Sequence, residues 1–122
     1  ALEKSLGGEI FVPKIASYRI MDVAEAIAPS LEKRITGIRP GEKIHEEMIT
    51  SSDSFNTFDI GENYIILPSD EKFKNKYKKR GINISDVKEG FSYNSGENPD
   101  FLKVEEIREL IKENIDNAFV PY

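Results

Sequence analysis

Residues 7–29 read GGEIFVPKIASYRIMDVAEAIAP, which is a strand pattern followed by a helix pattern. The run Glu9–Val12 ends in three strand-forming apolar residues and lies between glycine and proline, which predicts a short strand. Farther along, apolar side chains recur at helical spacing until Pro29 ends the pattern. They are Ile20, Val23, Ala24 and Ile27. A strand followed by a helix indicates an α/β fold, with a small sheet and flanking helices.

The alternation of strand and helix patterns continues after Pro29. Arg34–Ile38 predicts a second strand, which stops at an Arg-Pro-Gly sequence. Ile44 and Met48 lie four residues apart and predict a short helix that begins near Glu42.

The second half of the chain predicts a hairpin, a loop and a closing helix. Phe55–Ile60 and Tyr64–Leu67 have strand composition and are separated by Gly61, which favours a hairpin. Ser92–Asp100 is rich in turn residues and predicts a loop. The last helix has an apolar stripe and a charged outer face. The stripe consists of Val104, Ile107, Ile111 and Ile115.

A basic segment, Lys72–Arg80, contains six lysines and arginines around Phe73 and Tyr77. The two aromatic residues are four apart, so they share one face of a predicted helix. Two interpretations stay open: a solvated helix anchored by its aromatics, or a patch that meets an anionic ligand or partner.

Composition limits the class of protein. The 122 residues are 39% hydrophobic and 32% charged, as in one globular domain, and contain no cysteine. The net charge of −5 and the lack of a basic stripe argue against nucleic acid as a partner. No apolar run approaches the roughly 20 residues of a membrane span, and we expect no membrane association. The lack of cysteine permits a reducing compartment, and we expect a cytoplasmic location.

The first eight residues predict the tail of a helix from a preceding domain. Leu2 and Leu6 lie four apart, and Gly7 and Gly8 supply a stop signal. We therefore expect residues 1–122 to be a single domain within a larger protein.

Several motifs of catalysis and cofactor binding are missing from the sequence. There is no Gly-x-Gly-x-x-Gly, no Gly-Lys-Ser/Thr loop, and no lysine four residues after any tyrosine. The single histidine, His45, lacks the companions that a zinc site needs. We expect this chain to contain no catalytic residue, no cofactor-binding residue and no metal site.

The sequence GIRPGEKIHEE at residues 37–47 is the candidate binding motif. Proline and glycine predict a sharp turn that places Arg39 at a strand end and Glu42 at a helix start. Arginine can grip a diphosphate with two parallel hydrogen bonds, and a carboxylate can accept hydrogen bonds from ribose hydroxyls, which suits a nucleotide-sugar. The alternative is a local ion pair that only closes the turn. His45 alone indicates a packed or surface histidine.

Taken together, residues 7–15, 22–29, 37–48, 93–96 and 104–108 resemble the C-terminal part of the inverting UDP-N-acetylglucosamine 4,6-dehydratases, the first enzymes of pseudaminic acid synthesis. These enzymes are extended short-chain dehydrogenases/reductases. The resemblance implies that an NADP-binding Rossmann core and the catalytic residues precede this segment.

The same resemblance implies the role of the chain within its parent enzyme. Residues 1–122 would be the C-terminal substrate-binding lobe of a homo-oligomeric lyase of polysaccharide biosynthesis. Arg39 and Glu42 would contact the UDP portion of UDP-N-acetylglucosamine or a related UDP-sugar. We expect the 122 residues alone to bind no NADP and to be inactive.

Two rival interpretations of the function remain: the same lobe of a related nucleotide-sugar epimerase or dehydratase, and a non-catalytic α/β interaction module.

The family often has threonine at position 21 and serine or threonine at 103, where this chain has Met21 and Lys103. We expect both positions to be helix caps, each worth about 1 kcal/mol.

Overall fold

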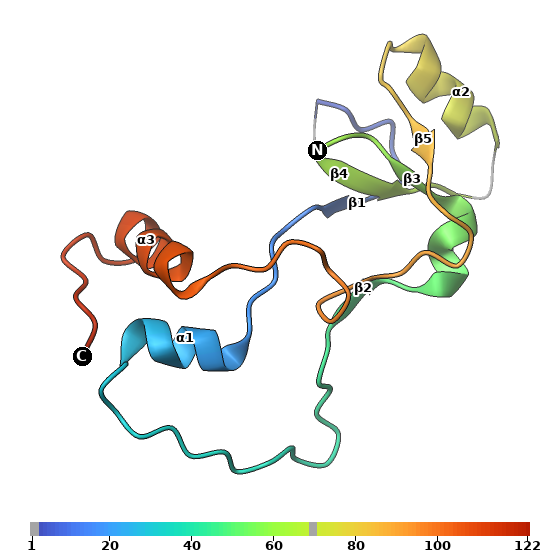
Figure 1. Cartoon of the computed structure of the whole chain (residues 1–122). Helices are drawn as coiled ribbons and strands as arrows, with labels where there is room; N and C mark the ends of the chain where they lie inside the picture. The colour runs from blue at the N-terminus through green and yellow to red at the C-terminus, as the bar shows by residue number, and fades with distance from the viewer. Residues whose placement is uncertain (1–2, 69–70) are drawn as a thin grey trace. The chain divides into compact units, whose positions relative to one another are not determined.

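The computed structural model describes residues 3–68 and 71–122, without the side chain of Glu71. The chain forms two compact units. Unit 1 consists of Ala1–Ile15 and Glu46–Asn94, and unit 2 consists of Ala16–His45 and Ser95–Tyr122. Figure 1 labels the three α-helices and strands β1 to β5. The predicted α/β fold class, with a small sheet and flanking helices, is confirmed.

Unit 1 is built on a four-stranded antiparallel sheet of order β1-β4-β3-β5. These strands are β1 (Ile10–Pro13), β3 (Thr57–Asp59), β4 (Asn63–Ile66) and β5 (Ser85–Asp86). The predicted strand at 9–12 is confirmed as β1. The predicted hairpin is also confirmed, because β3 pairs with β4 and Phe58 lies opposite Ile65.

The sheet of unit 1 buries side chains on both faces, because successive residues of a strand point in opposite directions. Ile65 is fully buried in one cluster, together with Tyr77 of α2 (Glu71–Lys79). Its neighbours Tyr64 and Ile66 pack against a second cluster. That cluster consists of Val12, Ile49 and Tyr93.

The second cluster is closed by a two-stranded ribbon in which β2 (Glu47–Ile49) pairs with β6 (Tyr93–Asn94). The Tyr93 hydroxyl accepts a hydrogen bond from the Ile15 N–H and donates one to the Ile15 carbonyl, both at 2.8 Å. The predicted loop at 92–100 therefore contains a short strand.

The basic helix is confirmed as α2, and its aromatic residues anchor it. Tyr77 is fully buried, and its hydroxyl donates a hydrogen bond to Glu9 Oε1 at 3.0 Å. Lys76 lies over the Phe73 ring, and Lys74 pairs with Asp86. These contacts agree with a solvated helix held by its aromatic face.

The predicted strand at 55–60 begins only at Thr57, because Ser51–Asn56 forms a 3₁₀ helix, η1. Asp53 closes the first turn of η1: its N–H donates to the Thr50 carbonyl at 3.0 Å, and its carboxylate accepts from the Thr50 N–H. Downstream, the Thr57 hydroxyl donates to the Asp53 carbonyl at 2.7 Å. Such local bonds compete with a strand ladder.

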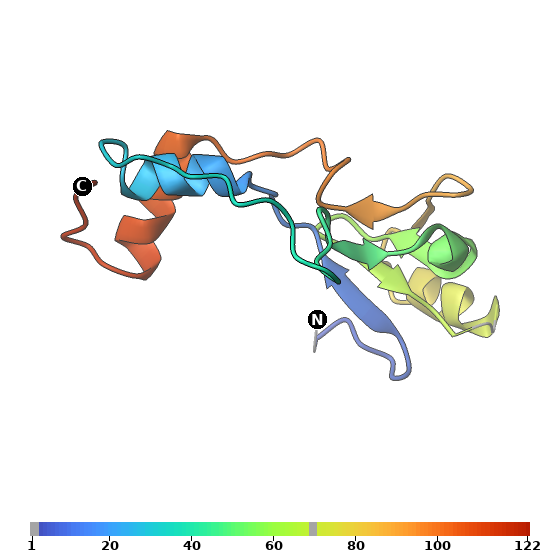
Figure 2. The ribbon, with the colours of Figure 1, turned by 90° about the horizontal axis from the view of Figure 1, so that it is seen from below.

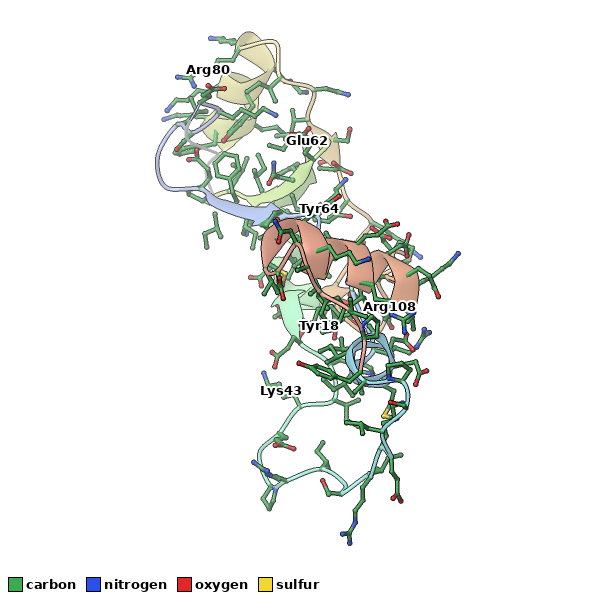
Figure 3. The ribbon with its side chains drawn as sticks, turned by 90° about the vertical axis from the view of Figure 1, so that its left-hand side faces the viewer. Tyr18, Lys43, Glu62, Tyr64, Arg80 and Arg108 are labelled. Carbon is green, nitrogen blue, oxygen red and sulfur yellow. The ribbon has the colours of Figure 1, made fainter. Side chains whose placement is uncertain are left out.

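Unit 2 contains two packed helices, α1 (Ile20–Ile27) and α3 (Val104–Asn114), which lie side by side in Figures 1 and 2. Both confirm predicted helices. Ala26 and Ile107 are buried between them. The Arg108 guanidinium, labelled in Figure 3, donates to the Ala26 and Glu25 carbonyls, each at 3.1 Å, and so satisfies the end of α1.

The predicted caps at positions 21 and 103 have different outcomes. Lys103 is the N-cap of α3, as expected, and its side chain makes no capping hydrogen bond. The Glu106 carboxylate instead accepts a hydrogen bond from the Lys103 N–H at 2.7 Å. The prediction for Met21 is wrong, because the N-cap of α1 is Arg19 and Met21 lies in the first turn.

Two predicted elements before residue 50 are wrong. Arg34–Ile38 is not a strand, because its backbone has no neighbouring strand among the described residues; Ile35 is 80% exposed. The helix expected from Glu42 is also absent. Ile49 is instead fully buried in strand β2, while Ile44 of the expected helical stripe is left exposed.

At the N-terminus, the expected helix tail falls partly on residues 1 and 2, which lie outside the described residues. Residues 3–8 form turns and bends rather than a helix. Leu6 packs against the cluster around Tyr77, and this contact ties the segment to unit 1.

Candidate functional site

The candidate site is a tight turn at residues 39–42 in unit 2. The Glu42 N–H donates to the Arg39 carbonyl at 3.1 Å, which is the hydrogen bond that closes a four-residue turn. Gly41 has φ +86°, a conformation that glycine adopts without strain. Pro40 precedes it in the position where a fixed φ favours a type II turn.

Arg39 and Glu42 are brought together by this turn. The Arg39 N–H donates to Glu42 Oε2 at 2.8 Å, and Arg39 Nε lies 3.9 Å from Glu42 Oε1. The Arg39 side chain is 87% exposed and that of Glu42 is 50% exposed. The carboxylate is therefore held by the backbone, while the guanidinium projects into solvent at the edge of ion-pair distance.

The surroundings of the turn differ from those expected. Arg39 does not end a strand and Glu42 does not begin a helix, because residues 31–46 contain only turns, bends and extended chain. Figure 2 shows this coil, and Figure 3 labels Lys43 on it. The expected proximity of Arg39 to Glu42 holds because it depends only on the turn. Both interpretations of the pair, a nucleotide grip and a local closure, are compatible with this geometry.

His45 lies against Gly96, a contact that the sequence did not predict. A Cβ atom added to Gly96 would lie 2.8 Å from both Cγ and Cδ2 of the His45 ring. The position of Gly96 next to the candidate motif was therefore not predicted from the sequence. The only signal for it was the Asn-Ser-Gly run at 94–96, and nothing in that run names the partner.

The strands of the described ranges differ from those of a Rossmann cofactor domain. All the strands named above pair antiparallel, so the parallel strand–glycine loop–helix unit that holds NADP is absent from the described ranges. Residues 3–68 and 71–122 contain no cluster of three histidine, aspartate or glutamate side chains that could hold a metal ion. Within the same ranges, no helix is long and apolar enough to cross a membrane.

Fold and site together define the class of protein: an α/β protein that carries an exposed Arg-Pro-Gly-Glu turn. A family model described as "Polysaccharide biosynthesis protein" matches residues 1–68. The chain belongs to this polysaccharide biosynthesis family.

Two similar proteins confirm the resemblance to the inverting UDP-N-acetylglucosamine 4,6-dehydratases that the motifs indicate. Two proteins named UDP-N-acetylglucosamine 4,6-dehydratase (inverting), from Campylobacter jejuni subsp. jejuni serotypes O:2 and O:23/36, are 46% and 42% identical to the chain. Each match covers 89% of this chain and 34% of the relative. The chain thus spans about a third of the length of these relatives.

More distant matches extend over a similar share. An uncharacterized membrane protein of Methanocaldococcus jannaschii is 33% identical over 88% of this chain and 32% of its own length. Among solved structures, the X-ray structure of Pen from Bacillus thuringiensis matches with a TM-score of 0.68 and 25% identity. The match covers 92% of this chain and 33% of that one.

Proposed function

We propose that the chain is the UDP-sugar-binding part of a UDP-N-acetylglucosamine 4,6-dehydratase that inverts C5. The observation that carries the proposal is the 42–46% identity, over 89% of the chain, to two proteins named as inverting dehydratases. The parent enzyme is a lyase of nucleotide-sugar biosynthesis in the cytoplasm. Its product feeds pseudaminic acid synthesis.

In this proposal, Arg39 and Glu42 hold the UDP portion of the substrate. The exposed guanidinium is free to turn its planar fork toward a diphosphate, because its present contact with Glu42 is long at 3.9 Å. The Glu42 carboxylate is oriented by the Arg39 N–H and can accept hydrogen bonds from ribose hydroxyls. Together the two groups fix the nucleotide end of the substrate.

The rest of the activity belongs to the parent enzyme, a homo-oligomer, outside these 122 residues. On the family resemblance, the cofactor and the groups that act on the sugar are assigned to a Rossmann domain that precedes this segment. The isolated 122-residue chain, supplied with NADP and UDP-N-acetylglucosamine, is expected to show no dehydration. Turnover by that chain would contradict this assignment.

The experiment that tests the role of the turn is the Arg39→Ala variant of the full-length enzyme. We expect UDP binding to weaken by about 2–3 kcal/mol, because a charge-assisted contact is lost and the phosphate keeps no substitute. Isothermal calorimetry with UDP measures the change directly. Arg34→Ala is the matched control, since Arg34 is an exposed arginine of the same coil. Equal affinities for both variants and the wild type would reject the UDP role of Arg39.

The sugar itself distinguishes the proposal from a related epimerase or dehydratase. The full-length enzyme is incubated with UDP-N-acetylglucosamine, and the product is examined by proton NMR. The 4-keto-6-deoxy product with inverted C5 is expected. A product that keeps its 6-hydroxyl would favour an epimerase with the same lobe.

A further inference from the structure

Gly96 differs from the other glycines of the chain in the reason for its presence. Seven of the eight glycines have positive φ, where a side chain would strain the backbone. They are Gly7, Gly8, Gly37, Gly41, Gly61, Gly81 and Gly90. Gly96 is not among them. Position 96 has no space for a side chain, because an added Cβ would lie 2.8 Å from the His45 ring. Gly96 is therefore explained by the close approach of His45.

The two residues flank the ribbon formed by β2 and β6. In the ribbon of unit 1, Glu47 pairs with Asn94 in an antiparallel ladder. The register of this ribbon shifts between Glu47 and Ile49. His45 lies in a bend just before β2, and Gly96 lies in a turn just after β6. The imidazole lies against Gly96, a residue without a side chain.

The His45–Gly96 contact lies three residues after the turn of Arg39 and Glu42. On the other side of the turn, the nearest recorded anchor is Lys33, whose Nζ donates to Glu25 Oε2 at 2.6 Å and to the Pro29 carbonyl at 3.0 Å. Among the described residues, the structure records no backbone hydrogen bond for Glu32–Ile38. The turn is therefore closed by its own two hydrogen bonds, and the downstream end is the nearer fixed point.

We propose that His45 is a positioning residue for the UDP-binding turn: its ring, seated on Gly96, fixes the chain that presents Arg39 and Glu42. This inference rests on the proposed function of the turn. The ring acts through its shape, and Gly96 provides the space for it. A turn that is already ordered loses less conformational entropy when the nucleotide binds. Displacing the ring is therefore expected to weaken UDP binding and to leave the rate of the chemical step unchanged.

The experiment compares His45→Ala, Gly96→Ala and the double variant in the full-length enzyme, with UDP as the calorimetric probe. Both single variants are expected to weaken UDP binding about tenfold, because each unseats the ring. In steady-state assays, KM for the sugar nucleotide rises and kcat is retained. The double variant is expected to be no weaker than either single variant, because both changes remove one contact.

His45→Phe separates shape from chemistry. A phenyl ring has nearly the same flat outline, so this variant is expected to bind UDP as the wild type does. A tenfold loss in His45→Phe would overturn the positioning role, because the imidazole would then contact the ligand itself. Unchanged UDP affinity in Gly96→Ala would overturn it as well.

The Arg39→Ala variant shows which proposal has failed. If Arg39→Ala weakens UDP binding and Gly96→Ala does not, the positioning role is rejected and the function of the turn stands. If neither variant changes UDP affinity, the assignment of the turn is itself rejected. Thermal unfolding of each variant checks that the fold is kept. His45 is exposed, so the ring has room to move out when position 96 gains a methyl group.

Discussion

The two units differ in how much they bury and in which residues they carry. Unit 1 has a sheet with clusters on both faces and several side chains that are fully buried, among them Tyr77, Ile49 and Ile65. In unit 2, Ala26 and Ile107 are the buried apolar residues of the described ranges. Ile20 and Ile115, by contrast, are 75% and 81% exposed.

The residues assigned to function belong to the unit with the smaller core. Arg39, Glu42, His45 and Gly96 all lie in unit 2, on coil rather than on a helix or strand. Irregular segments commonly carry binding residues, because their backbone can be shaped to a ligand without breaking a ladder. Unit 1 is therefore the scaffold, and the order of the coil that carries these residues in unit 2 depends on a few contacts.

Replacing a buried residue in each unit tests this difference in core. Tyr77→Ala is expected to lower the free energy of unfolding by about 3–5 kcal/mol, because it leaves a large cavity and removes the hydrogen bond to Glu9. Ile107→Ala, in the thinner core of unit 2, is expected to cost about 2 kcal/mol. Urea unfolding measures both changes, and hydrogen exchange shows which unit opens.

Tyr18→Ala is the matched control for the aromatic change, because Tyr18 is 59% exposed and its loss leaves no cavity. A larger loss for Ile107→Ala than for Tyr77→Ala would reverse the comparison and make unit 2 the scaffold.

A pH titration sharpens the comparison, because unit 1 holds a strongly perturbed carboxylate. Burial raises the pKa of Glu9. Hydrogen bonds from the backbone N–H groups of Leu6 and Glu9 and from the hydroxyls of Ser5 and Tyr77 outweigh burial and lower that pKa from 4.5 to about 2. A lowered pKa stabilises the fold above about pH 4.5, and this stability is lost as the pH falls toward 2. The loss is expected to be about 1–2 kcal/mol, because water screens a partly exposed carboxylate.

Glu9→Gln tests the assignment. This variant should be less stable than the wild type at neutral pH and should lose less stability between pH 4.5 and 2. Glu62→Gln, on the exposed β3–β4 turn, is the control and should keep the wild-type profile. Identical acid profiles for the wild type and Glu9→Gln would show that Glu9 does not carry the effect.

Sequence patterns predicted the elements whose stability is local or whose partner lies nearby in the chain. Helices α1, α2 and α3 follow from apolar spacing, and the β3–β4 hairpin follows from two strand patterns around Gly61. The pattern at Arg34–Ile38 is equally strand-like, yet a strand forms only where another backbone supplies hydrogen bonds. No local rule reveals whether that partner exists.

The candidate site divides in the same way. The Arg39–Glu42 turn could be predicted, because proline and glycine determine it within four residues. The strand at Glu47–Ile49 could not, because its pairing with Tyr93–Asn94 spans more than forty residues of sequence. The contact of His45 with Gly96 joins residues that are likewise far apart in the sequence, and only the structure shows it.

The smallest predicted effect concerns the caps of the two helices of unit 2. Lys103→Ser is expected to stabilise the chain by about 0.5–1 kcal/mol, because the serine hydroxyl can accept a hydrogen bond at the N-terminus of α3, where lysine offers no acceptor. Met21→Thr is the matched change on α1 and is expected to give no gain. The N-cap of α1 is Arg19, and Met21 is already the second residue of the helix. Thermal unfolding of both variants measures the difference. A gain for Met21→Thr equal to that for Lys103→Ser would place the N-cap of α1 at residue 21 instead of Arg19.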